Sequence, residues 1–237
     1  MYKTSVFVLC CFSAALAAPP IKKCTAQDSQ CIKQSAQQLI VPFANGIPEY
    51  KVQTLDPLQL TKEIDASSPS LKLKVRNMVV TGMKGCTAVK MERDIPKSKL
   101  YTTLLCDVHA EGQYEMKGRL LVLPIEGKGG AQVTLKKIQM SVESDLSDRT
   151  GRDGKKHWQI KSSRFSYELK DKSTLHFENL FNGNKLLAAT ADEVIRTNSN
   201  EIVMEIGKPI IKAIVDKIIE NVNHFYKTVP VEQFAYD

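Results

Sequence analysis

Hydrophobic residues recur at every fourth position along the C-terminal part of the chain, and this spacing is typical of an α-helix. The row consists of Ile202, Ile206, Ile210, Ile214, Ile218 and Val222, and it is widened by Val203, Ile211, Val215, Ile219, Phe225 and Tyr226. Charged residues occupy a narrow strip beside it: Glu205, Lys208, Lys212, Asp216, Lys217 and Glu220. A helix with so wide an apolar face is enclosed by the rest of the chain. We therefore predict one long enclosed helix, with Ile210 and Ile214 almost fully buried and Lys212 exposed.

Pro209 lies inside this row and lacks the N–H group that a helical hydrogen bond needs. The row keeps the same phase on both sides of Pro209, whereas a new helix start would not need to keep it. The sequence therefore predicts a kink at Pro209 rather than a break.

Between residues 58 and 181 the period of the pattern changes to two. Apolar and polar residues alternate over residues 71–76, 106–117, 133–136 and 165–169. Strands with one apolar and one charged face form an antiparallel sheet with water on one side. The alternation slips at Lys136-Lys137, and this slip predicts a β-bulge, which bends a sheet. Turns are predicted at Asp94–Lys99, Glu126–Gly130, Asp145–Gly154 and Lys170–Ser173.

A shorter helix is predicted at residues 28–45, where one face is apolar: Ile32, Ala36, Leu39, Ile40 and Phe43. Pro42 is expected to bend or stop this helix, and Gly46 to terminate it. The chain thus reads as a short helix, a meander of long strands and a long helix. The apolar face of the sheet must be buried, and the terminal helix is the only large apolar partner. We predict an α+β fold, a long curved antiparallel β-sheet wrapped around a long C-terminal α-helix.

The N-terminus has the features of a secretory signal peptide, predicted to be residues 1–17. Lys3 precedes the apolar run Val6–Leu16, and Ala15-Leu16-Ala17 supplies small residues for cleavage. No later stretch reaches about 18 uncharged apolar residues, so we expect no stable membrane insertion. Residues 18–237 contain no linker rich in Gly, Ser or Pro, and we predict that they form one extracellular domain.

Four cysteines follow the predicted signal, and an even number in a secreted chain favours disulfides. Cys24 and Cys31 are close in sequence. Cys86 and Cys106 lie symmetrically about Pro96 and would face each other across a hairpin that turns at Asp94–Ser98. These positions favour the pairs Cys24–Cys31 and Cys86–Cys106. Two buried free thiols at Cys86 and Cys106 are the alternative.

Charge and motifs exclude several classes of function. The net charge is +7, with a sequence pI of about 9.0, and the basic residues are scattered without a run of five. No nucleic-acid motif accompanies them. The four histidines are not at metal-ligand spacing, and no nucleophile motif is present. We therefore expect no nucleic-acid partner, no metal, no cofactor and no enzymatic activity.

Four short motifs occur in order along the chain. They are the pair Cys24 and Cys31, Gly46-Ile47-Pro48, Asp56-Pro57-Leu58, and the run from Glu178 to Leu187 that leads through Asn198 into the long helix. In this order, behind a signal peptide, the chain resembles the takeout and juvenile hormone-binding protein family of insects over essentially its whole mature length. The resemblance implies a sheet around a long C-terminal helix, a tunnel for an elongated hydrophobic ligand and a disulfide at Cys24 and Cys31. It also implies an association with biological rhythms.

The chain departs from the family pattern at three places. Ser199-Asn200 stand where takeout-like chains usually carry a tryptophan, and Ala188 stands where a glycine is expected. Both departures concern the end of the cavity. The pair Cys86 and Cys106 is not the second pair of hormone-binding members, so the chain resembles the takeout-like members more.

We predict a secreted carrier of an elongated hydrophobic small molecule, such as juvenile hormone, a fatty acid or a quinone. The predicted ligand-binding residues are Ile40, Phe43, Met78, Tyr114, Met140, Phe165, Tyr167, Ile206, Ile210, Ile214, Phe225 and Tyr226. A hydroxyl of Tyr114, Tyr167 or Tyr226 would orient the ligand. Two alternatives remain. One is a lipid-transfer protein that docks on anionic bilayers, and the other is a signalling protein with a filled core and an unidentified receptor.

Overall fold

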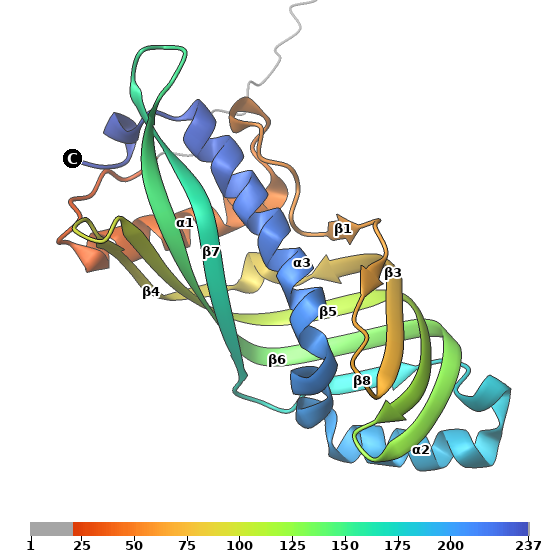
Figure 1. Ribbon diagram of the computed structural model, residues 1–237. Coiled ribbons are helices and arrows are strands. Elements are labelled where there is room, and N and C mark those ends of the chain that lie inside the picture. The colour runs from red at the N-terminus through yellow and green to blue at the C-terminus, as the bar shows by residue number, and fades with distance from the viewer. Residues whose placement is uncertain (1–20, 237) are drawn as a thin grey trace, which may run out of the picture.

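The structure is a computed structural model that describes residues 21–236, and it contains three α-helices and eight strands in that range (Figure 1). The predicted signal peptide lies outside the described residues. The helices are α1 Ser29–Asn45, α2 Lys185–Thr197 and α3 Ser199–Thr228. The strands are β1 Leu58–Leu60, β2 Ile64–Asp65, β3 Leu71–Thr81, β4 Thr87–Asp94, β5 Lys99–Leu120, β6 Leu123–Thr150, β7 Lys156–Leu169 and β8 Thr174–Phe177.

All eight strands belong to one antiparallel sheet. Its main path is β1-β3-β5-β6-β7, with β2 paired to β3, β4 to β5 and β8 to β6. The long strands β5 and β6 pair over almost the whole of β5, and in Figure 1 they pass α3 and curve toward α2. The predicted fold class, a long curved sheet with a long C-terminal helix against it, is confirmed.

The sheet bends at the predicted β-bulge. Cys106 pairs with Ile138, whereas Val108 pairs with Leu135, so Lys136 and Lys137 together oppose one residue of β5. Lys137 has φ 49°, a left-handed conformation, and its backbone N–H donates to Asp107 Oδ1 at 2.6 Å. A bulge of this kind increases the local twist and bends the longer strand.

Helix α1 begins and ends close to its predicted positions. Asp28 caps its N-terminus by accepting a hydrogen bond from the backbone N–H of Cys31 at 2.9 Å. The helix continues past Pro42 and ends at Asn45, before Gly46, whose φ is 87°. A side chain at Gly46 would meet backbone atoms of residues 52–54 at 3.0–3.2 Å, so glycine suits this position for both conformation and space.

One predicted turn is wrong, and another begins later than predicted. Residues 126–130 lie inside β6, and the β5–β6 turn is at Leu121 and Val122 instead. The turn predicted at Asp145–Gly154 is present, but it begins only after Thr150, where β6 ends. The glycines of residues 126–130 do not form a turn. They allow neighbouring parts of the chain to approach β6 closely. A Cβ at Gly127 would lie 2.5 Å from the Tyr114 hydroxyl, and one at Gly129 would lie 2.8 Å from the Glu178 backbone oxygen.

The C-terminal helical region divides at Asn198 into α2 and α3. Asn184 caps α2 by accepting from the backbone N–H of Leu187 at 3.2 Å. Helix α3 runs for 30 residues and is continuous through Pro209, so the prediction that the helix does not break there is confirmed. Lys212 is exposed, as expected.

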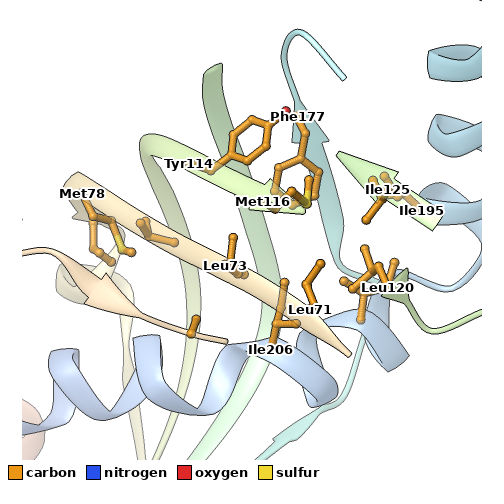
Figure 2. Close-up of a cluster of buried hydrophobic side chains, with 14 of the residues drawn as sticks. Leu71, Leu73, Met78, Tyr114, Met116, Leu120, Ile125, Phe177, Ile195 and Ile206 are labelled. Carbon is orange, nitrogen blue, oxygen red and sulfur yellow. The ribbon is translucent and has the colours of Figure 1, made fainter. Parts of the chain in front are cut away.

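One end of the molecule, near α2, has a densely packed interior that we call the packed end. Figure 2 shows side chains of β3 and β5 converging with Ile206 of α3 and Ile195 of α2. Leu71, Leu120 and Ile195 are each 1% exposed, and Ile202 is 0% exposed. Side chains enclosed this completely contribute about 1.5–3 kcal/mol each through burial.

Two disulfides join the cysteines as predicted: Cys24–Cys31 and Cys86–Cys106. The first ties the N-terminal segment to α1. The second joins the turn before β4 to β5. Gln37 of α1 is hydrogen-bonded to the same turn, because its amide donates to the Cys86 carbonyl at 3.2 Å and accepts from the Ala88 N–H at 2.7 Å.

Candidate ligand-binding cavities

An apolar cavity of about 300 Å³ lies between α1, strands β4 to β7 and the second half of α3. We call it the large cavity. Helix α1 contributes the apolar face that the sequence indicated: Ile32, Ala36, Leu39, Ile40 and Phe43. Helix α3 contributes Val215, Ile218, Ile219, Val222, Phe225 and Tyr226. Three parts of the chain, α1, the sheet and α3, therefore line this space.

A second apolar cavity of about 100 Å³, the small cavity, lies farther along the same helix. Its walls come from β3, β5, β6, β8 and the first half of α3. Residues of α3 that line it include Ile206, Ile210 and Ile214. The two cavities thus follow one another along α3, which is the arrangement that an elongated molecule needs.

A cluster of apolar side chains lies between the two cavities. Ile138, Ile211 and Val215 are each 5% exposed or less, and they pack together with Leu135 and Val203. Leu135 and Ile211 line the small cavity and Val215 lines the large one, whereas Ile138 lines neither. The cluster lies at the β-bulge, because Leu135 and Ile138 flank the two bulged lysines.

The predicted ligand-binding residues divide between the two cavities. Ile40, Phe43, Met140, Phe225 and Tyr226 line the large cavity. Met78, Tyr114, Ile206, Ile210 and Ile214 line the small cavity. Phe165 and Tyr167 line neither, since they pack against the cluster between the cavities. Contact of any of these residues with a ligand remains a prediction.

The expected burial of Ile210 and Ile214 is wrong. Both are partly exposed, whereas Ile211 and Val215, one position farther along the helix, are 5% and 3% exposed. Ile210 and Ile214 nevertheless line the small cavity and pack against the buried core. A regular apolar row does not distinguish a side chain that fills space from one that borders a void.

The three tyrosines differ in what their hydroxyls do. Tyr114 donates to the Glu178 carbonyl at 2.6 Å, and Tyr167 donates to the Val203 carbonyl at 3.1 Å. Burial raises the pKa of Tyr114 and of Tyr226 to about 12 and also raises the pKa of Tyr167. Of the three hydroxyls, the one on Tyr226 is not bonded to any residue in the range 21–236.

A buried histidine fixes the part of α3 that carries Tyr226. His157 is 2% exposed, and its Nδ1 donates to the Tyr226 backbone carbonyl at 2.8 Å. Its Nε2 lies 3.1 Å from both carboxylate oxygens of Asp153. The hydrogen bond with His157 holds the pKa of Asp153 below its ordinary value of 3.8. The histidine thus joins the β6–β7 turn to the end of α3.

Sequence reasoning missed many residues of the large cavity, and Arg93, Ser144 and Trp158 are among them. Arg93 is charged and close to a predicted turn, and a register shift in β4 between Ala88 and Lys90 hides which face it occupies. Ser144 is polar yet only 3% exposed. Trp158 is the one tryptophan of the chain, and its size could have indicated an interior position.

Residues 21–236 contain neither a cluster of metal-ligating side chains nor a candidate membrane-spanning helix. In this range no three His, Cys, Asp or Glu side chains are grouped as metal ligands would be. Within the same range no helix combines the length and apolar character that a membrane span requires.

Comparisons with known proteins agree with this architecture. The chain is 27% identical over 233 residues to the circadian clock-controlled protein daywake of Drosophila melanogaster, covering 91% of this chain and 86% of daywake. It is 24% identical over 159 residues to the juvenile hormone-binding protein of Manduca sexta, covering 65% and 59% of the two chains. The crystal structure of Epiphyas postvittana Takeout 1 superimposes with a TM-score of 0.88 at 28% identity, covering 92% of this chain and all of that one. Residues 5–235 match the model of the haemolymph juvenile hormone-binding protein family, and the chain belongs to this family.

Proposed function

We propose that the protein is a carrier of an elongated hydrophobic small molecule, such as juvenile hormone, a fatty acid or a quinone. The observation that carries this proposal is the large cavity, an apolar space of about 300 Å³ bounded by α1, the sheet and α3. The small cavity continues along the same helix. Membership of a family described as hormone-binding supports the same conclusion.

The physical driving force is burial of the ligand's apolar surface. A chain of about 15 methylene groups gains about 12 kcal/mol gross, at about 0.8 kcal/mol for each group. Loss of ligand freedom removes several kcal/mol of this gain. Micromolar or tighter binding, which requires about 8 kcal/mol, is therefore within reach without many polar contacts.

Secretion and the absence of catalysis belong to the same proposal. The two disulfides suit an oxidising extracellular environment. A carrier needs no cofactor and no nucleophile. Its partner is the hydrophobic ligand, and nucleic acid and stable membrane insertion play no part in this mechanism.

The two alternatives predict different features. A signalling protein that acts through a receptor needs no internal space, and the two cavities favour a carrier over it. A lipid-transfer protein would use its basic surface on anionic bilayers, and its binding to liposomes would weaken as salt increases.

The proposal is tested by filling the large cavity. Ile218→Trp adds volume at a residue that lines this cavity, and Met204→Trp makes the same kind of change at a residue of α3 that is 53% exposed. Delipidated protein would be titrated with a fluorescent apolar probe, 1-N-phenylnaphthylamine, and challenged with palmitic acid, a juvenile hormone and a quinone. We expect Ile218→Trp to weaken binding at least about tenfold and Met204→Trp to leave it unchanged, since about 1.4 kcal/mol of lost burial gives a factor of ten.

A complementary experiment identifies the natural ligand. Protein secreted from insect cells would be examined by native mass spectrometry, followed by lipid extraction. Wild-type protein that binds no member of a broad apolar panel and carries no extractable lipid would contradict the carrier proposal.

A further inference from the structure

The linings of the two cavities meet at one level of the sheet. No residue in the range 21–236 lines both cavities. Along β5, the lining of the large cavity ends at Leu104 and that of the small cavity begins at Val108, so Cys106 lies between them. Ile138 occupies the corresponding gap of β6 and is directly opposed to Cys106. Opposed residues of neighbouring strands project to the same face of a sheet, and these two pack into the same buried cluster.

Helix α3 completes this boundary from the opposite side. Ile211 lines the small cavity and Val215 lines the large one. The two residues are one helical turn apart and lie on the same face of the helix. They are 5% and 3% exposed, and Ile138 of the same cluster is 4% exposed. We call the four residues at this level the partition: Cys106, Ile138, Ile211 and Val215.

Two links hold the sheet side of the partition in place. The disulfide joins Cys106 of β5 to Cys86, which precedes β4. At the β-bulge, the backbone N–H of Lys137 donates to the Asp107 carboxylate at 2.6 Å. Lys137 adjoins Ile138 and Asp107 adjoins Cys106, so this hydrogen bond fixes the two sheet residues of the partition relative to each other.

Tyr167 of β7 holds α3 at the same level. Its hydroxyl donates to the Val203 carbonyl at 3.1 Å, and both side chains pack in the cluster that contains the partition. A Cβ at Gly207 would lie 3.5 Å from this hydroxyl, so the helix backbone approaches β7 closely. Side chains that are packed closely resist displacement, and extra volume among them strains the surrounding structure. The partition is therefore a fixed end of the large cavity.

The volume of the large cavity gives the size of chain that it can hold. An apolar cavity of about 150 Å³ accommodates one benzene molecule, which corresponds to about 25 Å³ for each carbon atom. At this ratio the large cavity, of about 300 Å³, holds about twelve carbon atoms. The small cavity, of about 100 Å³, would add about four more, but it lies beyond the partition.

We propose that the partition makes the large cavity a length-selective site for an apolar chain of about twelve carbon atoms. This inference rests on the proposed carrier function and narrows its ligand class by length. The apolar wall buries each methylene of a chain up to this length. The end of a longer chain meets the partition, so its additional methylenes gain no further burial.

The test measures affinity as a function of chain length. Octanoic, decanoic, dodecanoic, tetradecanoic and hexadecanoic acids would be titrated into delipidated wild-type protein by isothermal titration calorimetry. All five carry the same carboxylate, so differences in affinity report chain length. Up to dodecanoic acid, we expect the affinity to rise about fourfold for each methylene. From dodecanoic to hexadecanoic acid it should change less than about threefold, whereas continued burial would give about 200-fold.

Variants of the partition should move this limit. Ile138→Ala shortens a buried side chain that lines neither cavity, so it should connect the two cavities and let the affinity rise up to hexadecanoic acid. Ile202→Ala is the matched control, because Ile202 is also buried and lines neither cavity but lies at the packed end. It should leave the limit at dodecanoic acid. Val215→Ala opens the partition from the helix side with a smaller loss of packing, and it replaces Ile138→Ala if that variant does not fold.

Each contrary outcome has its own meaning. A steady rise in wild-type affinity up to hexadecanoic acid overturns the partition and leaves the carrier function standing. A limit that both partition variants leave at dodecanoic acid overturns the role of these residues. Release of the limit in Ile202→Ala assigns the effect to lost stability and also overturns that role. If wild-type protein binds none of the five acids, the length-selective site fails, and binding of a juvenile hormone or a quinone then decides whether the carrier function fails with it.

Discussion

The two ends of α3 meet very different surroundings. At the packed end, Ile202 is 0% exposed and is surrounded by fully buried residues of β3, β5 and α2. At the other end, Ile218, Ile219 and Val222 are only partly buried and border the large cavity. We call this second region the hollow end. Both sets of residues belong to one regular apolar pattern on one helix.

The difference lies in what faces the helix. At the packed end, large side chains such as Leu71, Leu120 and Ile125 reach the helix from the sheet and fill the space. At the hollow end, the large cavity separates part of α1 from the helix, and its α1 wall includes the small residues Ser35 and Ala36. The comparison shows that a cavity is a property of opposing surfaces, whereas a helical pattern describes only one surface.

The largest expected effect comes from shortening the same residue type at each end. Ile202→Ala removes fully buried atoms and leaves a new void, so it should lower the free energy of unfolding by about 4 kcal/mol. Ile218→Ala only enlarges a space that already exists, and about 1 kcal/mol should be lost. Denaturant unfolding of the two variants measures both changes. Equal costs would mean that the hollow end is as tightly packed as the other.

Removal of a disulfide should have the second-largest effect on the free energy of unfolding. Removing Cys86–Cys106 by a double change to serine opens a loop with a sequence separation of 20, and removing Cys24–Cys31 opens one of 7. Loop entropy predicts losses of about 3 and about 2 kcal/mol. Thermal unfolding of both variants would show the order. A larger loss at Cys24–Cys31 would indicate that the attachment of α1 at the hollow end matters more than loop length.

The smallest effect concerns charges on the outer face of the hollow end. Lys99 lies 2.5 Å from Glu143 and 2.8 Å from Asp145, and its hydrogen bonds lower the pKa of both carboxylates below their ordinary values of 4.5 and 3.8. A lowered folded-state pKa contributes stability above the unfolded-state pKa, and this contribution is lost as the pH falls through the folded-state pKa.

Lys99→Met should therefore be slightly less stable than wild type at neutral pH, and the difference should disappear in the acid range below the ordinary pKa values of the two carboxylates. Unfolding measured over a series of pH values tests this, with Lys161→Met, at an exposed lysine of β7, as the matched control. A difference that persists in acid would show that Lys99 acts through packing of its side chain.

Much of the fold could be predicted because its signals are local. The slip at Lys136-Lys137, the cap at Gly46 and the continuity of the helix through Pro209 are each set by neighbouring residues, and all three predictions are confirmed. The turn predicted at residues 126–130 failed for the opposite reason. No larger residue fits at Gly127 and Gly129, because Tyr114 and Glu178, which are distant in sequence, lie against them.

The candidate site was less predictable because it also depends on contacts between residues that are distant in sequence. Periodicity placed Phe43, Ile210 and Tyr226 on apolar faces, and these residues do line cavities. It did not show that Ile210 is only partly buried at the wall of the small cavity. It also passed over Arg93, because a charged residue on a strand is usually in water and only the register with Leu100 and Ser144 places it inside.

Trp158 gives the protein a built-in optical signal. It is the single tryptophan of the chain, so all indole fluorescence originates from one ring in the wall of the large cavity. A molecule that enters this space changes the polarity around the ring. The emission of unlabelled protein should therefore report occupancy directly, during loading and release, without any attached dye.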